Sequence, residues 1–307
     1  MPNHSGSIRI GEHLYPSSIM ELSNPTGKYV YRIFIKLLNL YSKKGIIRII
    51  GNNCAPGLSF PELIQGQGIS QFEGLTRNCP ILVANILGDA KFPDSVTVTA
   101  EPFMVVPINE NWNNFDDYLK AFSSKYRVRA NKTIQSSSEF YVEELSKKPS
   151  NEWIAPCAAL LHQTLQDKTI AIGKNLPELI HSYKKALGDN YRVFGYFLNG
   201  DLMGFISCIV GSETLYAMQL GMSKAVPSES KLYQRMLIDI ISLGIENKAK
   251  KVNLGRTGTE IKSTLGATPV ANSFVIFTRS KLLLNLFNFY LKYIHKIPQF
   301  TIRQPFK

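Results

Sequence analysis

The run Gly255-Arg256-Thr257-Gly258-Thr259-Glu260-Ile261-Lys262-Ser263 is the part of the sequence most specific for chemistry. Its first glycine ends a predicted strand, and Thr257 and Glu260 have the spacing of a capping box that opens a helix. Arg256 then lies beside the positive end of a helix dipole, which is unfavourable unless an anion is near. That anion is either a phosphate or carboxylate of a ligand, or Glu260 in a purely structural ion pair.

A second candidate phosphate contact is the loop Pro227-Ser228-Glu229-Ser230-Lys231, which precedes a helix that begins near Leu232. Backbone N–H groups at a helix N-terminus lack intrahelical partners and attract anions. We expect Ser228 or Ser230 to cap this helix and Lys231 to meet a ligand phosphate. An ordinary capped helix with a solvated lysine fits the same residues, because the loop is not glycine-rich.

A third feature is a basic cluster near the end of a predicted helix, formed by Lys125, Arg127, Arg129 and Lys132. Phe115, Phe122 and Arg129 are seven residues apart, so one continuous helix places Arg129 on the row that the aromatic residues direct to the core. A charge there needs a partner or an exit to water. The cluster is therefore either a frayed, solvated helix end or a basic wall of an active site.

Other catalytic and metal-binding patterns are missing from the sequence. It contains no Gly-x-Ser-x-Gly elbow, Rossmann fingerprint or P-loop. The four cysteines lie far apart without a Cys-x-x-Cys pair, which excludes a zinc ribbon and a dense disulfide scaffold. The five histidines show no ligand spacing, so we expect no metal.

The second half of the chain predicts the elements that position these residues. Asn199-Gly200 is a hairpin signal between two strand-like runs, 191–198 and 202–210, and a third strand follows at 214–221. The later elements are a helix from about 232, a short strand at 252–255, a short helix from 257 and a last strand at 273–278. This order predicts an α+β fold with a mixed sheet, in which the strands at 214–221 and 252–255 are parallel and joined by a right-handed helical crossover.

A polar connector at 109–114 divides the chain into an N-terminal αβ region, residues 1–110, and a C-terminal domain, residues 111–307. Before the connector, 46–50 and 96–106 have the β-branched composition of strands. After it, the predicted helices are 115–134 with Asn114 as the N-cap, 152–167 and 177–187.

Lys and Arg outnumber Asp and Glu by 35 to 23, which gives a net charge of +12. The first twenty residues have no apolar run, so we expect no signal peptide and a cytoplasmic protein. The charge indicates phosphate-bearing ligands, nucleic acid, an anionic membrane surface or simple solubility.

The C-terminal segment is free of acidic residues after Glu260. One narrow polar stripe runs along an otherwise apolar helix within it, formed by Lys281, Asn285, Asn288, Lys292 and His295. Residues 280–296 therefore either pack against the body of the protein or make a peripheral membrane contact.

An ordered set of motifs across residues 111–307 resembles the GNAT-type acyltransferases related to the Fem aminoacyl ligases. The motifs are Phe115-Asp116-Asp117-Tyr118-Leu119, Ser124-Lys125-Tyr126-Arg127, Leu232-Tyr233-Gln234, Gly255-Arg256-Thr257, Glu260-Ile261-Lys262-Ser263, Leu265-Gly266-Ala267-Thr268-Pro269 and the terminal Arg303-Gln304-Pro305-Phe306. Residues 1–110 match loosely, chiefly at Gly51-Asn52, so a first GNAT-like half rests on analogy with the tandem Fem fold.

The resemblance implies N-acyl transfer from a thioester or ester donor to an amine, with cell-envelope or polysaccharide biosynthesis as a candidate setting. It places the donor phosphates at a helix N-terminus, beside two parallel strands that diverge. The implied donor-binding residues are Gln219, Leu220, Gly221, Ser228, Ser230, Lys231, Arg256 and Thr257. The implied substrate-binding residues are Lys125, Tyr126, Arg127, Arg129, Glu260 and Lys262. Tyr233 is the candidate general acid, and a packing tyrosine fits the same position.

The resemblance also implies acyl-CoA, with acetyl-CoA the simplest case, as the co-substrate. Residues 221–231 lack the family's Arg/Gln-x-x-Gly-x-Gly/Ala phosphate loop, so an acyl carrier protein and aminoacyl-tRNA stay open as donors. The alternative hypothesis is a non-catalytic nucleic-acid-binding protein that uses the basic surface. The sequence has no interleaved aromatic and basic stripe, and we expect no stable nucleic-acid partner.

Overall fold

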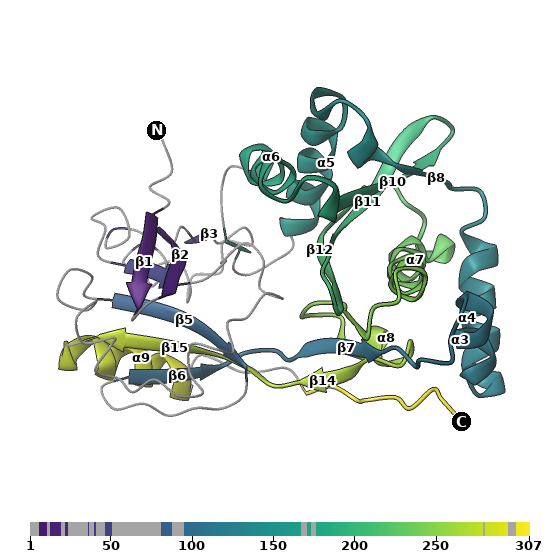
Figure 1. The fold of residues 1–307 in the computed structure, drawn as a ribbon. Coiled ribbons are helices and arrows are strands. Elements are labelled where there is room, and N and C mark those ends of the chain that lie inside the picture. The colour runs from purple at the N-terminus through teal and green to yellow at the C-terminus, as the bar shows by residue number, and fades with distance from the viewer. Residues whose placement is uncertain are drawn as a thin grey trace. The chain divides into compact units, whose positions relative to one another are not determined.

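The structure is a computed structural model that describes residues 6–10, 13–19, 22–23, 36, 40, 47–50, 81–87, 95–166, 171–172, 176–278, 280–293 and 299–307 (Figure 1). The chain divides into two compact units. The first contains residues 1–102, 169–174 and 270–299, and the second contains 103–168, 175–269 and 300–307. The sequence-based division at residue 110 differs from these two units. Each unit joins strands from distant parts of the chain, and such pairing leaves no pattern in the local sequence.

The second unit is built on a seven-stranded mixed sheet. Its strands are, in spatial order, β14 (Thr268–Val270), β7 (Phe103–Pro107), β13 (Lys251–Asn253), β12 (Thr214–Met222), β11 (Asp201–Val210), β10 (Tyr191–Leu198) and β8 (Tyr141–Glu144). β10, β11 and β12 form the predicted antiparallel meander, and β12 pairs with β13 in parallel. The α+β class and the mixed sheet are therefore confirmed.

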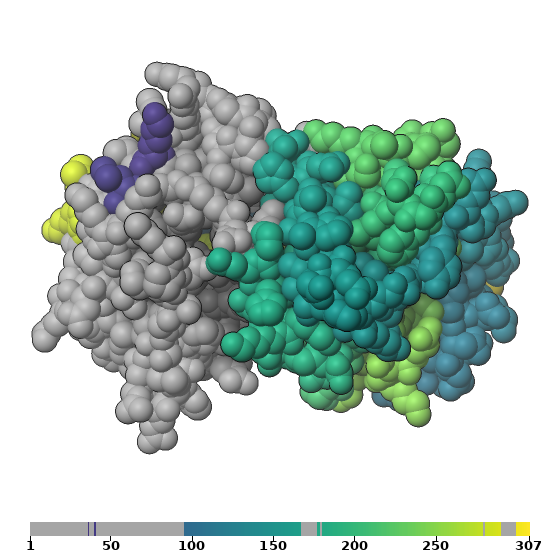
Figure 2. Space-filling model, turned by 90° about the horizontal axis from the view of Figure 1, so that it is seen from above, coloured from purple at the N-terminus to yellow at the C-terminus, as the bar shows by residue number. Residues whose placement is uncertain are grey.

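Helices cover both faces of this sheet (Figure 1). α5 (Ser150–Leu165) and α6 (Leu176–Leu187) lie on one face, and α7 (Leu232–Glu246) lies on the other. Gly221 permits the contact with α5, since a Cβ there would lie 2.6 Å from the backbone nitrogen of Leu161. Seen from above, the α5–α6 segment forms part of the surface, in teal (Figure 2). Short 3₁₀ turns are η2 (Leu145–Lys147), η3 (Gly188–Asn190) and η4 (Ser228–Ser230).

The single helix predicted at 115–134 is two helices, α3 (Phe115–Ala121) and α4 (Ser124–Ser136). Asn114 caps α3 as predicted, and its side chain accepts a hydrogen bond from the backbone amide of Asp117 at 3.1 Å. The helix breaks because Phe122 forms a β-bridge with Phe306. The break changes which residues share a face. Arg129 is exposed, so its charge has the exit to water that its place on the predicted row required.

The described strands of the first unit form a six-stranded sheet and a short separate pair. The six are, in spatial order, β1 (Gly6–Ile10), β2 (His13–Ile19), β4 (Ile47–Ile50), β5 (Ile81–Leu87), β15 (Asn272–Thr278) and β6 (Ser95–Thr99), and the pair is β3 (Leu22–Ser23) with β9 (Ala171–Ile172). The predicted last strand, β15, was expected in the sheet of the second unit. It pairs instead with β5 and β6. Both partner strands lie more than 170 residues earlier in the sequence, so local patterns do not reveal the pairing.

Helix α9 (Lys281–Tyr293) packs beside β6 and β15 in the first unit (Figure 1). His295, at the end of the predicted polar stripe, and the Gly51-Asn52 match lie outside the described residues. In the described part of the chain, no helix combines the length and the apolar character needed to cross a membrane.

Candidate functional site

The parallel strands β12 and β13 diverge after a short stretch of pairing. They pair only over Thr214–Tyr216 and Lys251–Asn253. Beyond this point Leu254 and Gly255 form hydrogen bonds with Met104 of β7, while β12 continues to Met222 without a described strand on that edge. The divergence therefore opens at the C-terminal end of β12, where open α/β sheets commonly place their ligands.

The turn after β13 is held in place by two side chains. Asn253 accepts a hydrogen bond from the backbone nitrogen of Gly255 at 2.8 Å, which forms an Asx turn. Lys262 is almost fully buried, and its Nζ donates to the carbonyl oxygens of Gly255 at 3.2 Å and Arg256 at 2.7 Å. Lys262, predicted to bind substrate, thus supports the backbone of the turn that carries Arg256.

Two helices begin at this end of the sheet after residues in the left-handed region. Lys231 (φ 53°) precedes α7, and Thr257 (φ 63°) and Gly258 (φ 60°) precede α8 (Thr259–Ser263). Such a conformation costs a residue other than glycine about 1–3 kcal/mol, and it is concentrated at functional sites. The strain marks both loops as candidates for ligand contact.

The predicted helix caps are wrong for α7 and α8. Ser230 donates to the carbonyl oxygen of Pro227 at 2.7 Å, Ser228 donates to Glu229, and α7 begins after Lys231 without a side-chain cap. α8 likewise begins after Gly258 without a side-chain cap, because the left-handed Thr257 is not placed for a capping box. The first amides of α7 are therefore not used by a capping side chain, which suits an anionic ligand.

Tyr233, in the first turn of α7, joins the two loops. Its hydroxyl lies against the backbone of Gly258, since a Cβ on Gly258 would be 2.6 Å from that oxygen. Among the described residues, no hydrogen bond of this hydroxyl is found. Burial raises the pKa of Tyr233 to about 12, so the phenol stays protonated at neutral pH. Tyr233 thus carries a proton at the end of the sheet where β12 and β13 diverge.

The remaining residues of this loop have different surroundings. Arg256 is half-buried and Thr257 is exposed. Glu260 is exposed, and its carboxylate accepts a hydrogen bond from the backbone nitrogen of Thr301 at 3.1 Å. Glu260 therefore anchors the C-terminal segment to α8.

Helix α4 brings its basic residues next to the α7 loop. α4 lies beside η4, and Thr133 donates to Gln234 of α7 at 3.0 Å. Lys125 and Arg129 are exposed and lie over the ring of Tyr126, at 5.9 and 5.6 Å from its centroid. Arg127 is half-buried. The predicted basic wall thus lies on a helix that contacts the candidate site.

The three predicted residues of β12 divide between the two faces of the sheet. Leu220 packs against the core beneath α7. Gln219 is buried on the α5 side, where it accepts hydrogen bonds from Tyr191 at 3.0 Å and Ser207 at 2.7 Å. Gly221 contacts α5. Gln219 therefore offers neither its side chain nor its backbone to the divergence, because its backbone nitrogen also donates to Ser207 at 2.9 Å and its carbonyl oxygen accepts from Ser207 at 3.2 Å. Leu220 and Gly221 can contribute only their backbone.

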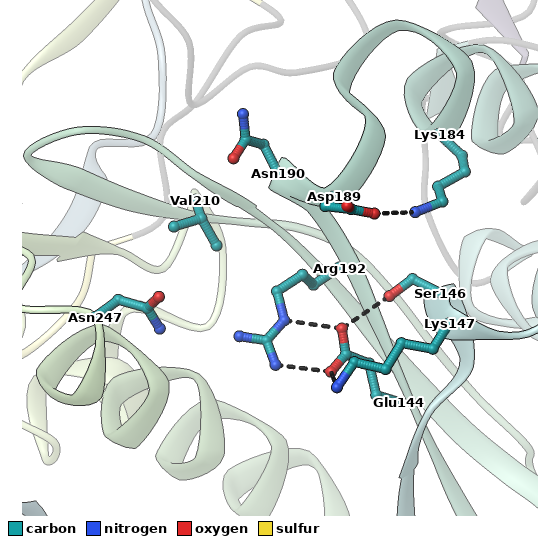
Figure 3. Close-up of a pocket in the computed structure, with 9 residues that line it drawn as sticks. All are labelled: Glu144, Ser146, Lys147, Lys184, Asp189, Asn190, Arg192, Val210 and Asn247. Atoms are coloured by element: carbon teal, nitrogen blue, oxygen red, sulfur yellow. Dashed lines mark hydrogen bonds and ion pairs between the residues drawn. The ribbon is translucent and has the colours of Figure 1, made fainter.

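A polar pocket of about 460 Å³ lies at the other end of the sheet, near the C-terminus of α7 (Figure 3). Arg192 donates to Glu144 through Nε at 2.9 Å and through a terminal nitrogen at 2.7 Å, and Lys147 lies 3.1 Å from the same carboxylate. Burial raises the pKa of Glu144, but hydrogen bonds from Arg192 and Lys147 outweigh it and lower that pKa to about 2. Because the Glu144 carboxylate is already bonded to both cations, we assign this cluster a structural role.

The contact between Tyr233 and Gly258 and the left-handed Lys231 were not predicted from the sequence. Asn253, two residues before Gly255, does carry a readable signal, because Asn in that position favours an Asx turn. No comparable local signal exists for the tyrosine–glycine contact, which joins the first turn of one helix to the loop before another.

No protein-family model matches the sequence, and no curated protein matches it. Solved structures do match. The chain is similar to the C-terminal (DUF2156) domain of a candidate lysylphosphatidylglycerol synthetase from Agrobacterium fabrum, with a TM-score of 0.52 and 13% identity over 94% of this chain and 88% of that chain. The chain has a GNAT-like fold.

Weaker matches include L-PGS from Bacillus licheniformis, with a TM-score of 0.48 and 11% identity over 82% of this chain and 84% of that chain. FemX matches with a TM-score of 0.46 and 10% identity over 71% of this chain and 77% of that chain. At these identities the likeness concerns the fold, and the residues of the site have to be judged on their own geometry.

Proposed function

We propose that this protein is an N-acyltransferase that moves an acyl or aminoacyl group from a thioester or ester donor to an amine. The observation that carries the proposal is the protonated Tyr233 hydroxyl, held against Gly258 where β12 and β13 diverge and where α7 begins without a side-chain cap. The GNAT-like fold supports acyl transfer, and the likeness to a domain whose protein is named for lysylphosphatidylglycerol synthesis supports an aminoacyl group as the group moved.

The chemistry assigns one task to each part of the site. The acceptor amine attacks the donor carbonyl, a C–N bond forms, and the C–S or C–O bond to the donor breaks. Backbone N–H groups of β12 past its pairing with β13 would stabilise the oxyanion that develops on the carbonyl oxygen, except those of Gln219 and Met222, which donate to Ser207 and Thr164. Tyr233 gives its proton to the departing thiolate or alkoxide and regains one from water, and the amine loses its proton to water.

The donor's phosphates would lie at the start of α7. The first backbone amides of α7, which have no capping side chain, can donate hydrogen bonds to the phosphates there. Lys231 and Arg256 add positive charge, and the exposed cations of α4 enlarge the positive surface. The loop 223–231 contains no glycine, so these side chains would carry more of the contact than a glycine-rich loop does. Acyl-CoA and aminoacyl-tRNA both fit this chemistry, and an acyl carrier protein supplies the same phosphopantetheine thioester.

Thermal-shift measurements with acetyl-CoA, a longer acyl-CoA, and charged and uncharged tRNA test donor binding. We expect one donor class to raise the melting temperature of the protein. Arg256→Ala should remove that increase while the melting temperature without donor changes little, and Lys120→Ala, on the exposed side of α3, should leave the increase intact.

Two results would count against the proposal. A large loss of stability in Arg256→Ala without donor would make Arg256 structural. Equal binding of charged and uncharged tRNA, with a steep fall in affinity as salt rises and no acyl transfer, would favour the non-catalytic nucleic-acid-binding alternative.

A further inference from the structure

Helix α9 presents an apolar row to solvent. Leu282 exposes 79% of its surface, Leu286 43% and Phe289 56%, and their spacing of four and three residues places them on one side of the helix. The opposite side packs beside β6 and β15, with Phe287 buried. Large apolar side chains in a contiguous exposed row mark an interaction surface more often than scattered single ones do.

A polar row runs along the same helix beside the apolar one. Lys281, Asn285 and Asn288 are exposed. With 3.6 residues per turn, the centres of the two rows are about 100° apart around the axis, and buried Phe287 is about 130° from each. The solvent-facing half of α9 is thus divided lengthwise into a polar and an apolar strip, which is the pattern of a helix that lies in a membrane interface.

The charge of the surrounding sequence is of one sign. Residues 270–299, the part of the acid-free segment that lies in the first unit, contain no Asp or Glu and carry Arg279, Lys281, Lys292 and Lys296. Two copies of such a segment would repel each other across a symmetric interface. A nucleic acid would bind the basic residues but would not bury the apolar row. An anionic lipid surface complements both features, because it offers negative head groups above an apolar layer.

We propose that α9 docks the protein on an anionic membrane surface, with Leu282, Leu286 and Phe289 entering the interface and the polar row facing the head groups. The helix has 13 residues and is about 20 Å long, so it lies along the surface and does not span the hydrocarbon core of about 30 Å. This inference depends on α9 and the basic residues that flank it, and it is independent of the proposed transferase activity.

Vesicle flotation with the full chain tests the proposal. We expect the protein to float with vesicles of equal parts phosphatidylserine and phosphatidylcholine, and to float poorly with phosphatidylcholine alone. Leu282→Ser combined with Leu286→Ser should weaken binding at least tenfold. Val128→Ser on α4, where the side chain is 65% exposed, is the matched control and should bind as the unaltered chain does. Raising the salt concentration should also weaken binding.

A second measurement keeps the test valid if the double variant folds poorly. Leu286→Trp adds an indole to the apolar row, and lipids brominated on their chains should quench its fluorescence beyond the change seen for the unaltered chain. Absence of flotation, equal flotation of the double variant, or an indole that brominated lipid does not quench would overturn the proposal. So would a concentration-dependent dimer that the double variant alone abolishes, because a second copy would then cover the row.

Discussion

Replacing Tyr233 by Phe separates a catalytic tyrosine from one that only packs. The substitution removes one hydroxyl and keeps the ring. In the described structure that hydroxyl has no hydrogen bond to lose, so the free energy of unfolding should change by less than about 0.5 kcal/mol. If Tyr233 is the general acid, the rate of acyl transfer should fall by about 10² to 10⁴, or about 3–5 kcal/mol in the activation barrier.

Tyr118→Phe provides the matched control. The Tyr118 hydroxyl is fully buried and donates to the carbonyl oxygen of Leu265 at 2.8 Å. Its removal should cost about 1–3 kcal/mol of stability, which is a few degrees in melting temperature for a unit of this size. The remaining folded protein should keep its rate. The two variants are thus expected to show opposite patterns.

The assay follows release of free CoA thiol, or of tRNA from its aminoacyl ester, with primary amines as acceptors, alongside urea unfolding. Because the pKa of Tyr233 is about 12, the phenol stays protonated across the usual assay range, so its titration should add no fall in rate near neutral pH. A Tyr233→Phe variant that keeps the full rate would refute the assignment. Loss of rate together with a stability loss like that of Tyr118→Phe would indicate a packing role.

Three further variants test the structure around the site. Glu144→Gln should lower stability at neutral pH by about 1–2 kcal/mol after allowance for solvent screening. The folded pKa of Glu144, about 2, is below its usual 4.5, so this stabilisation is present above pH 4.5, declines as the pH falls toward 2, and should be missing from the variant's acid unfolding curve. Gly221→Ala should cost about 1–3 kcal/mol in urea unfolding because its Cβ would meet the backbone of α5, and an unchanged midpoint would contradict the packing. Lys262→Met should lower the free energy of unfolding by about 2–3 kcal/mol, because it removes the ammonium group that hydrogen-bonds two carbonyl oxygens. Normal stability together with loss of acyl-donor binding would instead indicate that Lys262 contacts the ligand.

Local sequence patterns predicted the elements whose partners are close in the chain. The Asn199-Gly200 turn places both residues at positive φ, as a two-residue type I′ hairpin turn requires, and it connects β10 to β11 in the meander. The Asn114 cap and the parallel pairing of β12 with β13 were predicted from similarly short-range information. The Arg256 loop was also found this way, because a glycine, a cation and a helix start follow one another.

The sequence failed where a distant segment decided the local structure. Ser228, Ser230 and Thr257 have good capping chemistry, yet the left-handed Lys231 and Gly258 take the positions before the helices. The residues of 115–134 favour one continuous helix. Phe306, near the end of the chain, forms a β-bridge with Phe122 and breaks that helix into two. Intrinsic preferences of this kind are worth about 1 kcal/mol, and tertiary contacts of comparable size override them.

By itself, then, the sequence determined the α+β class, the hairpins, the helix that follows β12 and the region of positive charge, because each depends on neighbours within a few turns or strands. Only the tertiary structure decided that β15 belongs to the six-stranded sheet of the first unit, that Lys262 supports a turn, and that Tyr233 lies against Gly258. It also decided that one side of α9 is left exposed. These outcomes depend on which distant surfaces meet, and no periodicity or local propensity encodes that choice.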